Sequence, residues 1–344
     1  MRSRSLFAVL VTAALMFSAV AIVNGKSPQV TSVVYDNFSA SGGYTLANYN
    51  AKWSNIYGLG DMDPQAGPDT RNFSDGTFAI ADAPFRTAYD FSVYDHLKYI
   101  AISSAPPFPV PTNGSLTFSS DIAAQTPGTD RHHVVHGTYP DGAPYEATVL
   151  QGQQAGAVMN MVSFETGQLF DWFISGDRAF ALIERLPSSV TQNTADPLSP
   201  DWVGPDKMYT QIIVEVHADA NVTHHVGITY TRGTAPAISN VEYFLDGVSV
   251  AKVKNVGIPL DRQGYKYTGI YPSLGGGEDL RTKLNSFSIG HGTFSLLDAF
   301  PFQWCEPGYA EVCAKSVSIP LSERRFGQGV NAHFDNFTVT TRTN

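Results

Sequence analysis

The sequence predicts an all-β protein in which antiparallel strands follow one another with very little helix between them. Runs of alternating or continuous apolar residues recur almost end to end. Only 15% of the residues are charged, while Gly, Pro and aromatic residues are abundant, a composition typical of short strands joined by turns. Helical patterns are confined to residues 94–99 and 278–284, and no linker or repeat divides the chain. We expect strands at residues 29–38, 78–80, 115–122, 145–150, 158–164, 169–175, 179–186, 211–217, 286–290, 293–298 and 330–340, in a single domain over residues 26–344.

The clearest local signal is a hairpin within residues 224–253. Apolar and polar residues alternate on both sides of the Asp246-Gly247 pair, as they do in half-buried strands. Aspartate and glycine both tolerate positive φ, which the favoured two-residue hairpin turns require. This segment therefore predicts two or more strands joined by tight turns.

The same segment resembles the W/H-H-V-x-x-x-Y and Y/F-x-D-G-x-x-V signature of concanavalin A-like jelly rolls, the superfamily of lectins, laminin G-like domains and glucanases. The resemblance implies a jelly-roll sandwich of two antiparallel sheets with long decorating loops. It also implies that the first and last strands lie side by side, and residues 33–39 (VVYDNFS) and 332–339 (AHFDNFTV) are near-copies at opposite ends of the chain.

The resemblance extends to a possible structural Ca²⁺. Many jelly rolls of this superfamily bind calcium through oxygen ligands, and Asp36 and Asp335 occupy equivalent places in the two terminal strands. Together with backbone carbonyls they could supply the hard oxygens that calcium prefers. The alternative is that both are ordinary aspartates at strand ends. No cofactor is expected to be required.

The N-terminal residues read as a processing signal. Arg2 and Arg4 precede an apolar run with small residues at its end, as in a secretory signal peptide covering residues 1–25. A membrane anchor is the alternative, because the run approaches the length of a span. We expect cleavage and a secreted, extracellular protein with no later membrane segment.

Charge and cysteine usage fit that destination. The net charge of −9 argues against nucleic acid as a partner, and the oligomeric state is left open. Cys305 and Cys313 are expected to pair in an oxidising compartment and to close one surface loop. Five sequons for N-glycosylation predict exposed positions if the host glycosylates. These are Asn37, Asn72, Asn113, Asn221 and Asn336.

The strongest candidate for chemistry is the segment of residues 159–186. Read as three antiparallel strands, it places Asp171 among large hydrophobic side chains, where a carboxylate is either paired or has a raised pKa. Glu165 ends the preceding strand. Neighbouring strands bring such groups into the range at which two carboxyls act on a glycosidic bond. We therefore predict Glu165 and Asp171 as an acid/base pair.

Other residues of this segment are candidates for substrate binding: Trp172 as a stacking platform, and Glu184 and Arg185 as polar contacts. The alternative is structural, with Trp172 in the core, Asp171 capping a turn and the other two in surface pairs. The motifs F-E-T-G-x-x-F-D (residues 164–171) and E-R-L-P (residues 184–187) also resemble an uncharacterised family of secreted and bacterial proteins, which implies no known activity.

A second candidate cluster is DRHHVVHG, residues 130–137. His132 could act as a general base, and Arg131 could neutralise a substrate carboxylate, as β-elimination from a uronic acid requires. An ordinary polar loop is the alternative, and a metal site is a weaker one. His291, between two glycines, could line the concave sheet or be a satisfied core histidine.

These residues favour a protein that acts on a glycan or polysaccharide, with hydrolysis or β-elimination on the concave sheet. Two alternatives remain. One is a non-catalytic glycan-binding or adhesion module that uses Trp53, Tyr57 and Trp172 as stacking platforms. The other is an enzyme acting on a small molecule in a closed pocket. The E-x-D-x-x-E strand of jelly-roll glucanases and the R-x-E-x-R and Q-x-H motifs of alginate lyases are absent, so close membership of those families is not expected.

Overall fold

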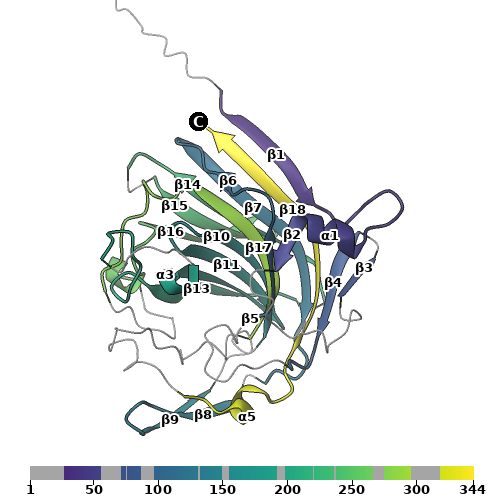
Figure 1. Ribbon diagram of the computed structural model, residues 1–344, viewed down its shortest axis with the longest axis vertical. Coiled ribbons are helices and arrows are strands. Elements are labelled where there is room, and N and C mark those ends of the chain that lie inside the picture. The colour runs from purple at the N-terminus through teal and green to yellow at the C-terminus, as the bar shows by residue number, and fades with distance from the viewer. Residues whose placement is uncertain are drawn as a thin grey trace, which may run out of the picture.

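Two large antiparallel sheets account for most of the fold in the computed structural model (Figure 1). The structure describes residues 27–55, 71–74, 76–86, 97–130, 132–148, 155–191, 198–219, 221–235, 238–265, 275–295 and 318–344. The sheets lie face to face, which confirms the predicted all-β jelly-roll sandwich.

Sheet A has the strand order β16-β15-β14-β7-β18-β4-β3, and β1 also pairs with β18. Its strands are β1 (Gln29–Asp36), β3 (Arg71–Ser74), β4 (Thr77–Asp82), β7 (Gly114–Gln125), β14 (His224–Arg232), β15 (Asn240–Leu245), β16 (Val248–Lys254) and β18 (Val330–Thr343).

Sheet B has the strand order β13-β12-β11-β10-β17-β5-β2, and the short β6 pairs with β17. Its strands are β2 (Trp53–Asn55), β5 (Leu97–Ser103), β6 (Phe108–Pro109), β10 (Gly156–Ser163), β11 (Gln168–Ser175), β12 (Arg178–Arg185), β13 (Tyr209–His217) and β17 (Ser286–Phe294). A separate hairpin joins β8 (Val134–Thr138) and β9 (Pro144–Thr148).

The hairpin predicted from residues 224–253 is present. Strands β14, β15 and β16 are consecutive antiparallel neighbours. Asp246 and Gly247 turn the chain between β15 and β16 with φ values of 50° and 79°. The Asp-Gly pair was therefore a reliable marker, because few other residues adopt positive φ at both positions without strain.

The first and last strands also pair as predicted. β1 runs antiparallel to the second half of β18, from Gln29 opposite Thr343 to Asp36 opposite Phe337 (Figure 1). The first half of β18 pairs with β4 on that same side, and β7 pairs along its other side. The long β18 thus holds three strands in one sheet.

Among the described residues helices are few, and the described parts of the segments predicted to be helical are not helices. Residues 97–103 form β5, so Tyr99 lies in a strand and not in a helix, and residues 281–283 form a turn. The structure instead has a helix α1 (Leu46–Lys52), whose start is fixed by reciprocal hydrogen bonds between Thr45 and Asn48, a capping box that satisfies free amides of the first turn. The other helical segments are α3 (Ser188–Thr191), α5 (Leu321–Arg324) and the 3-10 turn Asp261–Gln263.

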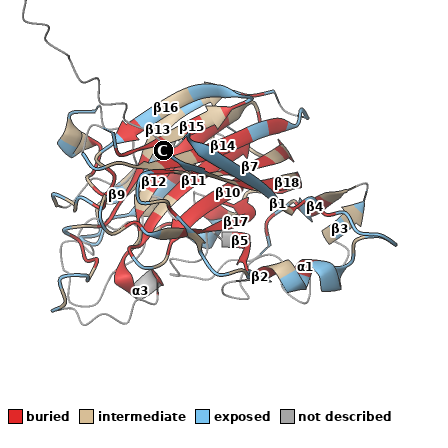
Figure 2. Cartoon of the chain, turned by 90° about the horizontal axis from the view of Figure 1, so that it is seen from above, coloured by how far each residue is buried: buried red, intermediate tan, exposed pale blue. Residues whose placement is uncertain are grey.

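The main core lies between the two sheets. Every residue of β10, and all but one residue of β11, is buried (Figure 2), whereas β7 alternates regularly between buried and partly exposed positions. The centre of sheet B is therefore shielded from solvent on both faces, while its edge strand β13 is partly exposed and sheet A has one face toward water. Among the described residues, no helix is long and apolar enough to cross a membrane.

Candidate functional site

The two faces of sheet B have different neighbours. Trp172 points toward sheet A, where its indole NH donates to the carbonyl of Gly227 at 3.2 Å. Residues on either side of Trp172 in β11, including Asp171, point the other way because side chains alternate along a strand. We call the side of sheet B that is turned away from sheet A the outer face.

Polar side chains cross the outer face along a diagonal. Asn160 on β10 lies directly opposite Asp171 on β11, and its amide donates to Asp171 Oδ1 at 2.5 Å. Glu184 on β12 lies one diagonal step from Asp171. Thr210 on β13 lies directly opposite Glu184 and donates to Glu184 Oε2 at 2.9 Å. Four consecutive strands thus contribute one polar group each.

Asp171 and Glu184 form an acidic pair with raised pKa values. Burial raises the pKa of Asp171 well above its usual range, and the charge of Glu184 raises it further, against the lowering effect of the Asn160 amide. Burial also raises the pKa of Glu184, and hydrogen bonds with Asp171 and from Thr210 partly offset this. When a low-polarity environment and a like charge act together, one carboxyl stays protonated near neutral pH. Because burial and the neighbouring charge both raise the pKa of Asp171, the protonated form is favoured at Asp171 more strongly than at Glu184.

Two polar atoms of this diagonal have no hydrogen-bond partner of good geometry. They are Oδ1 of Asn160 and Oδ2 of Asp171, and both residues are at most 1% exposed. A buried polar atom without a partner costs about 1–3 kcal/mol, and such atoms in a native fold call for an explanation. The Glu184 carboxyl lies within hydrogen-bond reach of Asp171, so Oδ1 of Asn160 is the acceptor that a donor group of a ligand would satisfy.

Apolar side chains surround the diagonal. They form a cluster distinct from the main core, and all are at most 6% exposed. Gly290 on β17 lies directly opposite Asn160, and Ile102 packs so closely there that a Cβ at position 290 would fall 2.3 Å from Ile102 Cδ1. The members of the cluster are Ile100, Ile102, Val158, Val162, Phe173, Phe180, Leu182 and Phe294.

The structure does not bring Glu165 to Asp171. Glu165 lies exposed in the turn between β10 and β11, and three residue pairs separate that turn from Asp171 along the strands, roughly 10 Å at the usual rise per residue. The carboxyl that accompanies Asp171 is Glu184, which the sequence analysis placed among substrate contacts. Glu184 accompanies Asp171 because the register between β11 and β12 places both side chains on the outer face of sheet B.

Trp172 and His291 both face the main core. Trp172 is 0% exposed and His291 is 0% exposed. His291 Nε2 lies 2.8 Å from the hydroxyl of Tyr49, and the ring packs edge-on to Trp53 at 4.4 Å between centroids. Burial lowers the pKa of His291 to about 3. Trp172, Trp53 and His291 therefore pack inside the sandwich and do not present a stacking surface, and Tyr57 lies outside the described residues.

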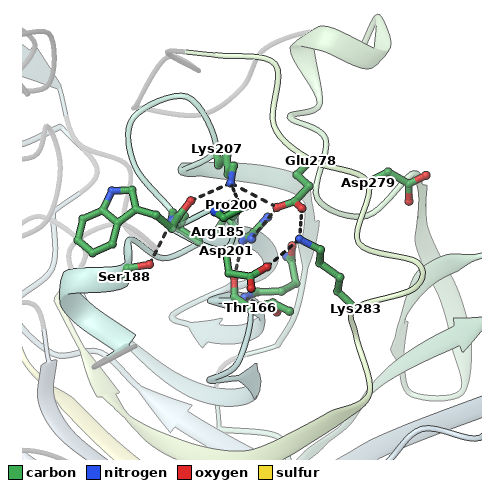
Figure 3. Close-up of polar contacts among 12 residues, drawn as sticks. Thr166, Arg185, Ser188, Pro200, Asp201, Lys207, Glu278, Asp279 and Lys283 are labelled. Atoms are coloured by element: carbon green, nitrogen blue, oxygen red, sulfur yellow. Dashed lines mark hydrogen bonds and ion pairs between the residues drawn. The ribbon is translucent and has the colours of Figure 1, made fainter. Parts of the chain in front are cut away.

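Arg185 belongs to a network of ion pairs at the end of β12 (Figure 3). Its guanidinium is 2% exposed; it donates to the Thr166 carbonyl and lies 3.3 Å from Glu278. Lys283 pairs with the same glutamate, and these cations hold the pKa of Glu278 below its usual value despite its partial burial. The network ties the turn before β11 to residues 278–283, away from the outer face.

The histidine cluster is only partly described. His132 is exposed in a turn, where its backbone NH donates to Asp130 at 2.8 Å, and Arg131 lies outside the described residues. His136 lies on β8, with Nδ1 3.1 Å from Glu323. Nothing among the described residues connects these groups with Asp171.

The carboxylate of Asp36 already accepts hydrogen bonds from three side chains of the protein. The Trp53 indole donates to it at 2.8 Å, Tyr44 donates at 2.5 Å, and Lys52 pairs with it at 2.9 Å. Asp335 is opposite Asp121 on β7 and partly buried. Within the described ranges, no group of three or more His, Cys, Asp or Glu residues could hold a metal ion.

The predicted modification sites are described unequally. Cys305 and Cys313 lie outside the described residues. Asn37, Asn72, Asn113 and Asn221 are exposed, whereas the amide of Asn336 is partly buried and donates to Asp121 at 2.7 Å. These placements make the first four the accessible sequons.

The sequence analysis missed Asn160 and Thr210. Asn160 had a detectable signal: it is the one amide in the apolar run AVMNMV, at a position that faces the same way as Asp171. Thr210 had none, because a threonine in a strand is common.

The chain belongs to a family of unknown function (DUF6081), whose model matches residues 63–343. The matched region includes both motifs of residues 164–171 and 184–187. No curated protein matches the chain.

Solved structures with a similar course of the chain have low sequence identity. An endo-1,3-β-glucanase from Streptomyces sioyaensis is 9% identical, with a TM-score of 0.45, over 93% of this chain and 98% of that one. An inactivated β-agarase B in complex with agaro-octaose is 12% identical, with a TM-score of 0.44, over 92% and 95%. An alginate lyase from Pseudomonas aeruginosa is 7% identical, with a TM-score of 0.35, over 84% and 97%. At these scores the matches carry no inference about activity, and membership of the DUF6081 family is what identifies the chain.

Proposed function

We propose that this protein is a secreted carbohydrate-active enzyme that hydrolyses a glycosidic bond at the outer face of sheet B. The observation that carries the proposal is the pair of neighbouring carboxyl groups, Asp171 and Glu184, with raised pKa values on that face. Glycoside hydrolysis uses two carboxyls in different protonation states, and the surroundings of this pair favour such a difference.

Asp171 is the proton donor in this mechanism. Its protonated carboxyl gives the proton to the glycosidic oxygen as the bond from that oxygen to the anomeric carbon breaks. Asn160, whose amide contacts Asp171 Oδ1, fixes the orientation of the carboxyl. Proton transfer from a positioned acid contributes on the order of 10²–10⁴ in rate.

Glu184 is the second carboxyl. It is partly exposed and receives a hydrogen bond from Thr210, which favours its ionised form. Its carboxylate attacks the anomeric carbon and forms an ester. Asp171, now ionised, removes a proton from water, which hydrolyses the ester and frees both groups for another cycle. The two carboxyls are close enough to hydrogen-bond to each other, which leaves no room for the water that inversion requires between them, so we expect retention.

The test is turnover on a panel of polysaccharides, followed by the release of reducing ends. Asp171→Asn and Glu184→Gln should each abolish turnover and leave binding of the same polysaccharide intact. Glu165→Gln, at an exposed turn, is the matched control and should retain activity. Retention of the anomeric configuration, read by proton NMR at early times, is the expected stereochemistry.

Two other outcomes of this experiment would indicate a different function. Unsaturated products would show β-elimination. Binding without any product, unchanged in Asp171→Asn, would identify a non-catalytic glycan-binding module and would refute the enzyme proposal.

A second candidate function has an observation in its favour. The eight apolar side chains around the acidic pair provide a dry environment that suits a small apolar molecule with a single polar group better than a polymer of sugars. This candidate predicts that short-chain alcohols or amides perturb the NMR signals of Asn160 and Asp171, while oligosaccharides leave them unchanged.

A further inference from the structure

β1 is an exposed edge of sheet A. It pairs along one side with β18, and no described strand pairs with its other side. Val30 is 62% exposed, Val33 58% and Val34 55%, and Figure 2 shows the strand in the colour of exposed residues. Because Val33 and Val34 point to opposite faces, their exposure shows that neither face of the strand is covered at this point.

Among the described strands, the other long sheet edges carry charged residues, whereas the exposed part of β1 does not. Lys252 and Lys254 lie on β16, at the far edge of sheet A, and Glu215 lies on β13, at an edge of sheet B. The remaining edge strands, β2 and β3, are three and four residues long. Charges and short strands are the usual means by which proteins prevent pairing at their edges. From Gln29 to Tyr35, β1 contains no charged residue.

The sequence of β1 is also suited to pairing with itself. If a two-fold axis passes at Ser32, then Val30 lies opposite Val34 of the second copy, and Thr31 lies opposite Val33. Val30, Ser32 and Val34 point to the same, solvent-facing side of the strand, so the two symmetry-related Val30–Val34 contacts form on that side. An antiparallel pair of identical strands satisfies the free main-chain groups of both copies, and it closes as a two-fold dimer.

We propose that two copies of this chain associate through β1, antiparallel and centred on Ser32, so that sheet A continues across the dimer. This assembly does not depend on the acidic pair or on the proposed activity. We infer that a second copy of the chain binds this edge for two reasons. The exposed part of β1 has no charge that would repel an identical strand, and its two exposed valines on one face would contact those of the second copy.

Light scattering coupled to size-exclusion chromatography, over a dilution series of the mature protein, tests the proposal. At high concentration the mass should be twice that of one chain. The double variant Val30→Lys with Val34→Lys should be monomeric, because lysines then face lysines, and so should Val30→Glu with Val34→Glu. An equal mixture of the two variants should regain the dimer, because lysine then faces glutamate. Val248→Lys, at an equally exposed valine of β16 (63%), is the control and should stay dimeric.

A second measurement does not depend on charge. Ser32→Cys should form a disulfide-linked dimer under mild oxidation, because directly opposite residues of antiparallel strands have Cα atoms about 4.5–5.5 Å apart, within reach of a disulfide. Ser249→Cys on β16 should not. A monomer at every concentration, a lysine variant that remains dimeric, or equal cross-linking at both positions would overturn the proposal.

Discussion

Replacing Asp171 with Asn should make the protein more stable at neutral pH. The folded protein holds this carboxyl at 0% exposure, where burial and the Glu184 charge raise its pKa well above the usual value. Asparagine has nearly the same shape, keeps the contact with the Asn160 amide, and cannot ionise. The substitution therefore isolates the cost of holding a carboxyl in this position.

The sign follows from proton linkage. Between the unfolded pKa of about 3.9 and the raised folded pKa, the unfolded chain has lost the proton while the folded protein still holds it. Unfolding then releases a proton, so wild-type stability falls as pH rises through this window, by about 1.4 kcal/mol per unit. The free energy of unfolding of Asp171→Asn, relative to wild type, should rise by that amount per unit from about pH 4 until the folded pKa is reached.

Urea denaturation at half-unit steps from pH 4 to pH 8 measures this difference. Glu184→Gln is a second test. Removing the charge of Glu184 lowers the pKa of Asp171, so the pH range over which wild-type stability falls should be narrower in this background. Glu165→Gln, in an exposed turn, should run parallel to wild type. If the curves of wild type and Asp171→Asn run parallel over the whole range, Asp171 is not held protonated and the reasoning fails.

Four further substitutions test other parts of the structure. Arg185→Ala should lower the free energy of unfolding in urea by about 1–3 kcal/mol, because it leaves the Thr166 carbonyl, to which the buried guanidinium donates, without a partner. Lys283→Ala, with a side chain 38% exposed, should cost at most about 1 kcal/mol, because Arg185 and Lys207 still face Glu278. Equal effects would contradict the burial of Arg185. Below about pH 6.5 the unfolded chain binds a proton at His291, but the folded protein does not, because burial lowers the pKa of the imidazole to about 3. The stability of His291→Phe relative to wild type should therefore rise by about 1.4 kcal/mol for each pH unit below about 6.5. Denaturation at pH 7 and pH 5 measures this, and an equal difference at both pH values would contradict it. Trp172→Ala should cost about 3–5 kcal/mol in the same assay, and a loss of glycan binding without a loss of stability would instead place Trp172 at a surface.

Most of the strands could be predicted from local patterns, because alternation and turn residues depend only on residues that are close in the sequence. The alternation around Asp246-Gly247 identified a hairpin, and the matching ends of the chain identified two paired strands. The alternation within β11 also placed Asp171 and Trp172 on opposite faces correctly. What alternation could not decide was which of those faces meets sheet A, since both faces of β11 are apolar and both are buried.

The partner of Asp171 depended on the register between strands, which the sequence did not determine. Glu165 is nearer along the chain, but the turn after β10 carries it away from the outer face. Glu184 comes into place because Leu182 pairs with Asp171, a matter of turn length at Gly176-Asp177. The two alternatives for His291 stayed open for a related reason, because the glycines on both sides gave no alternation that could show which face of β17 its ring would occupy. The structure places it in the core.

The proposed mechanism depends most on the protonation state of Asp171 at neutral pH, which carbon NMR measures directly. In protein labelled at the aspartate carboxyl carbon, the Asp171 signal, assigned by its absence in Asp171→Asn, should keep the chemical shift of a protonated carboxyl at pH 7 and titrate well above the usual range of aspartate. The same signal should move to lower pH in Glu184→Gln. An Asp171 carboxyl that is ionised at pH 7 and titrates near pH 4 would contradict the account.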